Sequence, residues 1–303
     1  MKTILVPTDF SEPAENAARY ALHLSKTLKS NLRLCHAFFV PADAPMAARI
    51  AWPLYEYSTM EAATHKQLHQ LVKKLAYSNE VVSNLLSFQP SIEYNGVAGE
   101  VIPVINELVE EKRIGMVIMG MSGKGDYEHF PLGSNSRRMI EGGSCPVLLV
   151  PGSFLFKGIR KIAFATDLNQ DDVELIHSLA TIASKFDAEI IVIHISTKHK
   201  KDEALESKET AFLKNIRELT NYQKIYYREV KNSDIDKGLD QLGRDGNIDM
   251  LAMVHRPKGF FGKLFQGSHT KRQANYISIP LLVFPAHKRT SANGLSKKML
   301  SLY

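Results

Sequence analysis

The sequence contains an internal repeat. The segment Met1–Asp9 (MKTILVPTD) returns as Ile159–Asp167 (IRKIAFATD), and the apolar run Leu32–His36 returns at the same offset as Ile190–His194. Repetition of whole segments across a chain of 303 residues is typical of a duplicated domain. The chain must therefore fold as two related units, each with its own strands and helices.

A second set of matches occurs at a shorter offset near the end of each half. Gly133-Ser134 matches Gly267-Ser268, and Pro146–Val150 matches Pro280–Phe284. The first half is therefore longer, and we place its extra residues within Val40–Leu86. We expect domain 1 to cover residues 1–151 and domain 2 to cover residues 159–286, with a linker at 152–158 between them. Residues 287–303 are expected to form a basic tail without fixed structure.

Within each half, short apolar runs alternate with amphipathic helical patterns. Ser11 is placed to cap the first helix, with Pro13 in its first turn. This alternation predicts an α/β fold of two tandem doubly wound parallel sheets with five main strands each. Ligands of such sheets bind beyond the carboxyl ends of the strands. The first-half strands are predicted at 3–7, 32–38, 92–97, 116–120 and 147–150, and the later helices at about 60–86, 101–109 and 135–140.

A glycine-rich stretch follows the fourth predicted strand of the first half. Gly120 and Gly123 are followed by Gly133-Ser134, and the next helical pattern starts at Asn135. Glycines let backbone N–H groups approach a phosphate, and a helix N-terminus adds partial positive charge. The stretch is not a Walker A loop, because no G-K-[ST] closes it. It predicts a phosphate cradle of another kind.

Composition and charge argue against a membrane, secreted or nucleic-acid-binding protein. The chain has an apolar share of 44% and no apolar run long enough to span a membrane, and its start shows no signal peptide, so we expect a cytoplasmic protein. Cys35 and Cys145 lie in apolar runs and are expected to be reduced core thiols. The net charge of +6 comes largely from the tail, with Lys288, Arg289 and a later lysine pair. Nucleic acid is therefore not the expected partner.

These residues together resemble the universal stress protein (UspA) family, and in particular its tandem two-domain members. The resemblance runs from Met1 to about Pro285 and rests on Val6–Asp9, His36-Ala37, the glycine spacing and Cys145–Val147. It implies an adenine nucleotide α-hydrolase-like, Rossmann-type fold whose domains pair through their last strands. Family members with this glycine spacing commonly bind ATP.

The resemblance also implies roles for particular residues. Asp9 would face the ribose and a Mg²⁺ ion carried by the nucleotide, and Ala37 would face adenine. Gly120 and Gly123 would line the ribose and first phosphates. No covalent cofactor is implied. The full set of implied nucleotide-binding residues is Pro7, Thr8, Asp9, Ala37, Met119, Gly120, Gly123, Gly133, Ser134, Asn135 and Ser136.

The second half departs from this pattern. Val254 and Pro257 stand where the two leading glycines should be, while Gly267, Ser268 and Asp167 remain. A branched side chain and a residue without an N–H are poorly suited to a phosphate loop. We therefore expect one nucleotide site, in the first half, and a degenerate copy that serves mainly as a structural partner.

Other functions stay open at this point. The leading hypothesis is an ATP-binding stress-response protein whose contacts with an unknown protein partner, or with a second copy, depend on the nucleotide. The alternatives are a scaffold that binds no nucleotide and a slow ATPase or self-phosphorylating protein using Ser134 or Ser136. No nucleophile–base pair indicates an enzyme. His65 and His69 stand four residues apart on a predicted helix, but without a third ligand they are interpreted as a polar face.

Overall fold

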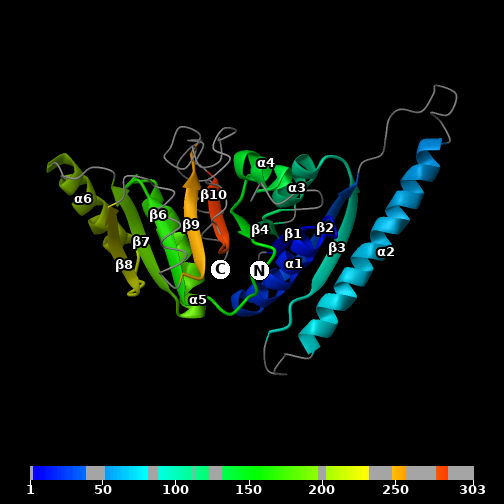
Figure 1. The fold of residues 1–303 in the computed structure, drawn as a ribbon, viewed down its shortest axis with the longest axis horizontal. Helices are drawn as coiled ribbons and strands as arrows, with labels where there is room; N and C mark the ends of the chain where they lie inside the picture. The colour runs from blue at the N-terminus through cyan, green and yellow to red at the C-terminus, as the bar shows by residue number, and fades with distance from the viewer. Residues whose placement is uncertain are drawn as a thin grey trace.

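The structure is a computed structural model in which ten strands form one sheet with helices on both faces (Figure 1). It describes residues 3–38, 52–80, 88–111, 113–122, 132–196, 203–231, 248–256 and 278–285. The first-half strands are β1 (Thr3–Pro7), β2 (Asn31–Phe38), β3 (Ile92–Ala98), β4 (Ile114–Gly120) and β5 (Val147–Val150). The second-half strands are β6 (Lys161–Thr166), β7 (Glu189–Ser196), β8 (Ile225–Lys231), β9 (Met250–His255) and β10 (Leu281–Pro285).

Six helices are described between these strands. They are α1 (Glu12–Leu28), α2 (Trp52–Glu80), α3 (Val101–Glu111), α4 (Ser134–Gly142), α5 (Asp172–Phe186) and α6 (Glu203–Leu219). The order of strands and helices in the first half is the one that the sequence predicts, with boundaries that differ by a few residues at most, except in α2. That helix is present from Trp52, earlier than predicted, and is described as far as Glu80; its predicted end near residue 86 lies outside the described residues. At 29 residues it is longer than its 17-residue counterpart α6, so the helix takes up part of the extra length of the first half.

The strand order explains how two halves make one sheet. It runs β3-β2-β1-β4-β5-β10-β9-β6-β7-β8, so each half has the same order and the second is reversed relative to the first. All neighbours are parallel except β5 and β10, which pair antiparallel with Leu148 opposite Leu282. The predicted pairing of the last strands is therefore confirmed, and it covers two sheet edges that would otherwise be exposed.

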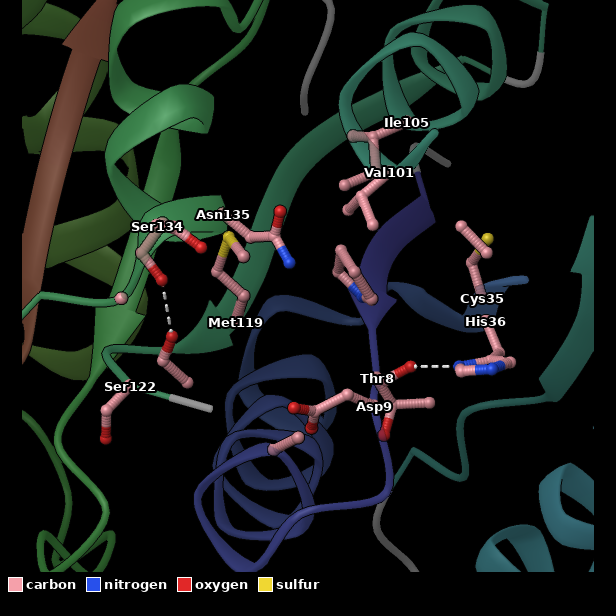
Figure 2. A pocket seen from close by; sticks show the side chains of 16 residues that line it. Thr8, Asp9, Cys35, His36, Val101, Ile105, Met119, Ser122, Ser134 and Asn135 are labelled. Atoms are coloured by element: carbon pink, nitrogen blue, oxygen red, sulfur yellow. Dashed lines mark hydrogen bonds between the residues drawn. The ribbon is translucent and has the colours of Figure 1, made fainter. Parts of the chain in front are cut away.

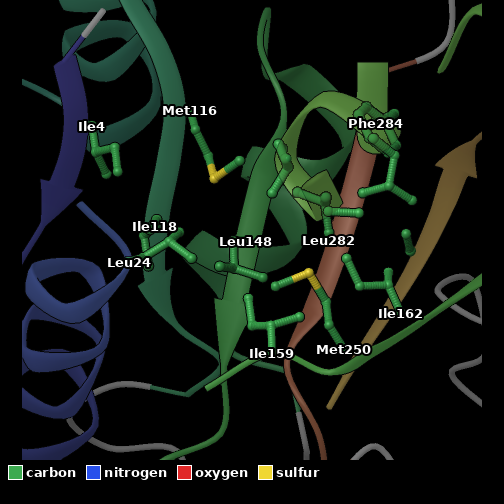
Figure 3. Packing of buried hydrophobic residues seen from close by; sticks show 14 of the residues in the cluster. Ile4, Leu24, Met116, Ile118, Leu148, Ile159, Ile162, Met250, Leu282 and Phe284 are labelled. Atoms are coloured by element: carbon green, nitrogen blue, oxygen red, sulfur yellow. The ribbon is translucent and has the colours of Figure 1, made fainter. Parts of the chain in front are cut away.

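The central strands of the sheet, such as β4, β5 and β9, are buried on both faces, as its doubly wound order requires. Alternate residues of one strand, such as Ile118 and Val117, belong to different apolar clusters. The first cluster packs beneath α1, α2, α5 and α6, and the second beneath α3 and α4. Both clusters continue across the β5–β10 pair, where Leu148, Met250 and Leu282 lie together (Figure 3). The two halves therefore share their core rather than meeting at a polar surface.

The linker after β5 is fixed to the first helix. The buried Asn16 side chain donates hydrogen bonds to the carbonyl oxygens of Pro151 and Phe154, at 3.1 and 2.9 Å. Phe156 then packs edge-on against Tyr20, with ring centroids 5.0 Å apart, and also contacts Phe186 of α5. These contacts connect helix α1 of the first half to helix α5 of the second through the linker.

None of the helices in the described part of the chain is long and apolar enough to span a membrane. The second-half segments that correspond to α3, to the glycine loop and to α4 lie outside the described residues, as do Lys258, Lys263, Lys271, Arg272 and the basic tail. The location of the protein and the division of the chain at residues 152–158 stay predictions.

Candidate nucleotide pocket

A pocket lies at the point where the strand order of the first half reverses. Strands β1 and β4 are neighbours there, but the chain leaves them toward opposite sides, β2 following β1 and β5 following β4. A crevice opens beyond the carboxyl ends of strands arranged in this way. Residues from β1, β2, β4 and the starts of α3 and α4 surround the pocket (Figure 2).

The structure brings together ten of the eleven residues that were predicted to bind nucleotide. Gly123 lies outside the described residues. The pocket is also lined by six residues that were not predicted. The predicted lining residues are Pro7, Thr8, Asp9, Ala37, Met119, Gly120, Gly133, Ser134, Asn135 and Ser136, and the additional ones are Ala14, Cys35, His36, Val101, Ile105 and Ser122.

The turn after β1 is held by its own side chains. The Thr8 hydroxyl accepts a hydrogen bond from the Phe10 N–H at 3.0 Å, and Asp9 Oδ1 accepts the N–H of Ser11 at 3.0 Å. Ser11 in turn caps α1, because its hydroxyl accepts the Ala14 N–H at 3.4 Å. Phe10 has a positive φ of 61°. The Thr8-Asp9 pair therefore forms the helix-capping turn and at the same time directs the Asp9 carboxylate to the pocket.

His36 fixes the neighbouring strand end. Its Nδ1 lies 2.7 Å from the Thr8 carbonyl oxygen, and the same contact recurs in the second half, where His194 Nδ1 lies 3.1 Å from the Thr166 carbonyl oxygen. For this hydrogen bond Nδ1 must carry the proton, because a carbonyl only accepts. The two halves therefore share this hydrogen bond between neighbouring strand ends.

Gly120 is required by close packing. A Cβ at this position would lie 2.9 Å from the Ser122 carbonyl oxygen and 3.1 Å from the Pro13 carbonyl group. The Ser136 hydroxyl donates to the Gly120 carbonyl oxygen at 2.9 Å and is buried. The proton of Ser136 is therefore engaged in joining the end of β4 to the start of α4.

The N-terminus of α4 faces the pocket, and no side chain caps it in the part of the chain that the structure describes. Gly133 occupies the N-cap position, has ordinary extended dihedral angles of −64° and 157°, and is followed by the exposed residues Ser134 and Asn135. Its own N–H donates to the Met121 carbonyl oxygen at 2.8 Å. The first amides of a helix have no partner within the helix, so they form an anion-binding position. The dihedral angles of Gly133 suit any residue, so glycine is not required there by the backbone conformation.

Charge in the described part of the pocket is sparse. Asp9 is the single carboxylate among its lining residues, and no lysine or arginine is present among them. Val101 and Ile105, on the first turns of α3, provide an apolar wall (Figure 2). Burial raises the pKa of the Cys35 thiol to about 12, so this thiol stays protonated at neutral pH. The predicted core role of Cys35 and Cys145 agrees with their burial as free thiols.

The histidine pair of α2 lies beside an aromatic side chain. His65 and His69 are exposed on α2, and both rings lie against Tyr94, at 5.9 and 6.3 Å between centroids. Across the residues that the structure describes, no group of three or more histidine, cysteine or acidic side chains is placed to hold an ion. Both histidines therefore lie on an exposed face of α2 beside an aromatic ring.

The family assignment follows from the whole chain. The model of the universal stress protein family matches it twice, over residues 1–151 and 158–285. The chain belongs to the universal stress protein family. The two matches agree with the internal repeat and with the repeated strand order of the two halves.

Individual relatives agree with this assignment. A universal stress protein from Methanocaldococcus jannaschii is 27% identical over 151 residues, which are 49% of this chain and 81% of the relative. The crystal structure of a universal stress protein from Archaeoglobus fulgidus superposes with a TM-score of 0.61 at 16% identity, covering 95% of this chain and 97% of that one. A putative universal stress protein from Pseudomonas aeruginosa gives a TM-score of 0.54 at 16% identity, over 100% of this chain and 96% of that one. These two structures show the shared tandem fold.

Proposed function

We propose that this universal stress protein binds ATP, or another adenine nucleotide, in the first-half pocket and acts in the stress response through nucleotide-dependent contacts. The observation that carries the proposal is the convergence of Asp9, Gly120 and the uncapped start of α4 at Gly133 on one pocket at the switch point of the sheet. Membership of the family supports the stress-response role.

The chemistry of the pocket suits the parts of such a ligand. The apolar wall of Val101 and Ile105, together with the backbone near Ala37, suits a flat base. The backbone amides of Ser134 and Asn135 suit phosphate oxygens. Asp9 offers a carboxylate, the ligand type that Mg²⁺ prefers, and the ion would bring positive charge that the described lining residues lack.

Titration calorimetry with Mg-ATP tests the proposal. Gly133→Val places a branched side chain at the start of α4 without straining the backbone, so we expect it to reduce affinity by at least tenfold. Gly142→Ala is the matched control on the same helix, because a Cβ there would meet nothing nearer than Ile102 Cγ2 at 3.9 Å. Absence of binding by the unaltered protein at millimolar Mg-ATP would refute the proposal.

A direct catalytic role is not part of this proposal. Of the two serines considered as phosphate acceptors, Ser136 is buried and donates to Gly120, whereas Ser134 is exposed at the pocket. Incubation with γ-labelled ATP therefore tests self-phosphorylation at Ser134. Label that appears on the unaltered protein and is lost in Ser134→Ala would add self-phosphorylation to the function.

A further inference from the structure

Two small residues of the first-half pocket have oppositely charged counterparts in the second half. Ala14 and Ser122 line the pocket, from the first turn of α1 and from the chain after β4. The residues at the corresponding repeat positions are Asp172, at the start of α5, and Arg256, directly after β9. A change at both positions that produces a matching pair of charges indicates a direct contact.

The structure shows that contact. One guanidinium nitrogen of Arg256 donates a short hydrogen bond to Asp172 Oδ1, and the other lies 3.7 Å from Oδ1 of Asp167, the counterpart of Asp9. The second oxygen of Asp172 accepts the Thr166 hydroxyl at 2.7 Å. Arg256 therefore lies between two carboxylates at the carboxyl ends of β6 and β9.

Because Asp172 is buried, its pairing with Arg256 matters for the stability of the fold. Its side chain is 1% exposed and that of Arg256 is 21% exposed. A buried carboxylate is stable only when it is paired and its lone pairs are satisfied. The forked guanidinium suits this task, since it can contact two acceptors at once. Oδ1 of Asp167 has no hydrogen-bond partner among the described residues, so the cation of Arg256 is also what compensates this atom.

Two further differences between the halves lie at the same sheet edge. One reduces the free space and the other adds positive charge near the carboxylates. Val254, the counterpart of Gly120, is 3% exposed and fills volume that the first half leaves to the backbone alone. Lys208 of α6 donates to the Asp167 carbonyl oxygen at 2.8 Å and adds a second positive charge. The second half thus places its own side chains, Lys208 and Arg256, against the groups at these strand ends.

We propose that Arg256 is an internal ligand that closes the second-half crevice: its guanidinium bridges Asp167 and Asp172 and leaves this half structural rather than ligand-binding. The comparison with a bound nucleotide in the first half rests on the proposed function, but the bridge itself does not. Arg256 and Asp172 are then the residues that make the two repeats differ in function.

A mutant cycle tests the bridge without any nucleotide. Arg256→Ser and Asp172→Ala restore the first-half residues, alone and together, and urea unfolding gives the midpoint of each variant. We expect Arg256→Ser alone to lower the midpoint by about 1 M, because it leaves a buried charge unpaired. Adding Asp172→Ala should recover more than half of that loss. Equal midpoints for Arg256→Ser and the unaltered protein, or no recovery in the double variant, would overturn the proposal.

If Arg256→Ser does not fold, the double variant still decides, because the proposal requires that it folds. Hydrogen exchange provides a second reading in the same molecules. The segment 166–172 should exchange at least tenfold faster in Arg256→Ser, while the repeat counterpart 8–14 stays unchanged as an internal control. Unchanged exchange of residues 166–172 contradicts the bridge.

The same exchange experiment with Mg-ATP separates this inference from the proposed function. In the unaltered protein, Mg-ATP should protect residues 8–14 and leave 166–172 unprotected. Protection of 166–172 would overturn the closed second half. Protection of neither segment would contradict the proposed nucleotide binding, and the mutant cycle would then decide on the bridge alone.

Discussion

The side-chain amide of Asn16 donates to the carbonyl oxygen of Phe154 across the boundary between the first half and the linker, at 2.9 Å. Asn16 lies on α1, which begins at the pocket, and Phe154 lies beside the aromatic contacts that reach α5. The linker is therefore anchored to the core through Phe154 and Phe156, although Leu155 between them is exposed.

Replacing Asn16 should destabilise the whole chain. Asn16→Leu keeps a similar volume but removes the side-chain donor to the half-buried Phe154 carbonyl oxygen and one of two donors to the Pro151 carbonyl oxygen, which also accepts the Phe154 N–H. We expect a loss of about 1–3 kcal/mol in the free energy of unfolding. Urea unfolding followed by circular dichroism measures it. Exposed Glu12→Gln, also on α1, serves as the control, and a loss below about 0.5 kcal/mol for Asn16→Leu would contradict this role.

Gly120→Ala should be destabilising even without ligand. Its Cβ would approach the Ser122 carbonyl oxygen to 2.9 Å, and that neighbour is backbone, which cannot move aside like a side chain. The expected cost is about 1–3 kcal/mol, typical of overpacking. The measurement is thermal unfolding beside Gly142→Ala. Equal melting temperatures for the two variants would show that close packing does not require Gly120.

Nucleotide affinity should depend on magnesium. The described pocket has Asp9 as its single carboxylate and lacks basic side chains other than His36, so ATP without a cation would meet uncompensated negative charge. We expect excess EDTA to weaken ATP binding at least tenfold, and Asp9→Asn to reduce that ratio. Calorimetry with and without EDTA measures both. Tighter binding of metal-free ATP would contradict the assigned role of Asp9.

Acid should weaken the fold through His23. Burial, with a smaller effect of Lys26, lowers the pKa of this imidazole, which stacks on Phe156 at 5.3 Å. The unfolded state therefore binds a proton more readily, and this contribution to stability is present above about pH 6.5 and lost as the pH falls toward the folded-state pKa. His23→Phe, which keeps a ring, should show a smaller difference between urea midpoints at pH 5 and pH 7.5. An unchanged difference would exclude His23 as the cause.

The Arg256→Ser variant should have the opposite pH dependence. Burial raises the pKa of Asp172, although Arg256 and Thr166 oppose the shift, and Asp167 adds to it. Without Arg256 the pKa rises further. A carboxyl group with a raised folded-state pKa destabilises the fold least when it is protonated. The loss of stability in Arg256→Ser relative to the unaltered protein should therefore shrink as the pH falls from 7.5 to 5. Urea midpoints of both proteins at the two pH values measure this, and a deficit that grows in acid contradicts it.

Much of the fold was predictable because it depends on local patterns. Apolar runs with strand length, Ser11 ahead of α1 and the repeat of Met1–Asp9 identify the strands, the cap and the duplication. The pocket followed from one topological rule, that parallel strands end at the same edge. The start of α2 was not predicted, because the helical pattern was assigned only from about Met60, and Pro53, which a helix tolerates in its first turn, lies before it.

Other features depend on distances that no local pattern contains. Val101 and Ile105 were assigned to a helix, but which of its faces lies over the pocket depends on how α3 packs on the sheet. The pairing of Asp172 with Arg256 joins residues far apart in the chain. Aligning the repeats would have placed them opposite Ala14 and Ser122, and that was the available signal.

Counting the nucleotides bound per chain tests the asymmetry of the two halves most directly. Native mass spectrometry of the intact protein, titrated with Mg-ATP, resolves each bound species. We predict saturation at one nucleotide per chain, because the first-half pocket is lined for binding and Arg256 closes its counterpart. Two nucleotides per chain at saturation would contradict the closed second half, and none would contradict the nucleotide pocket.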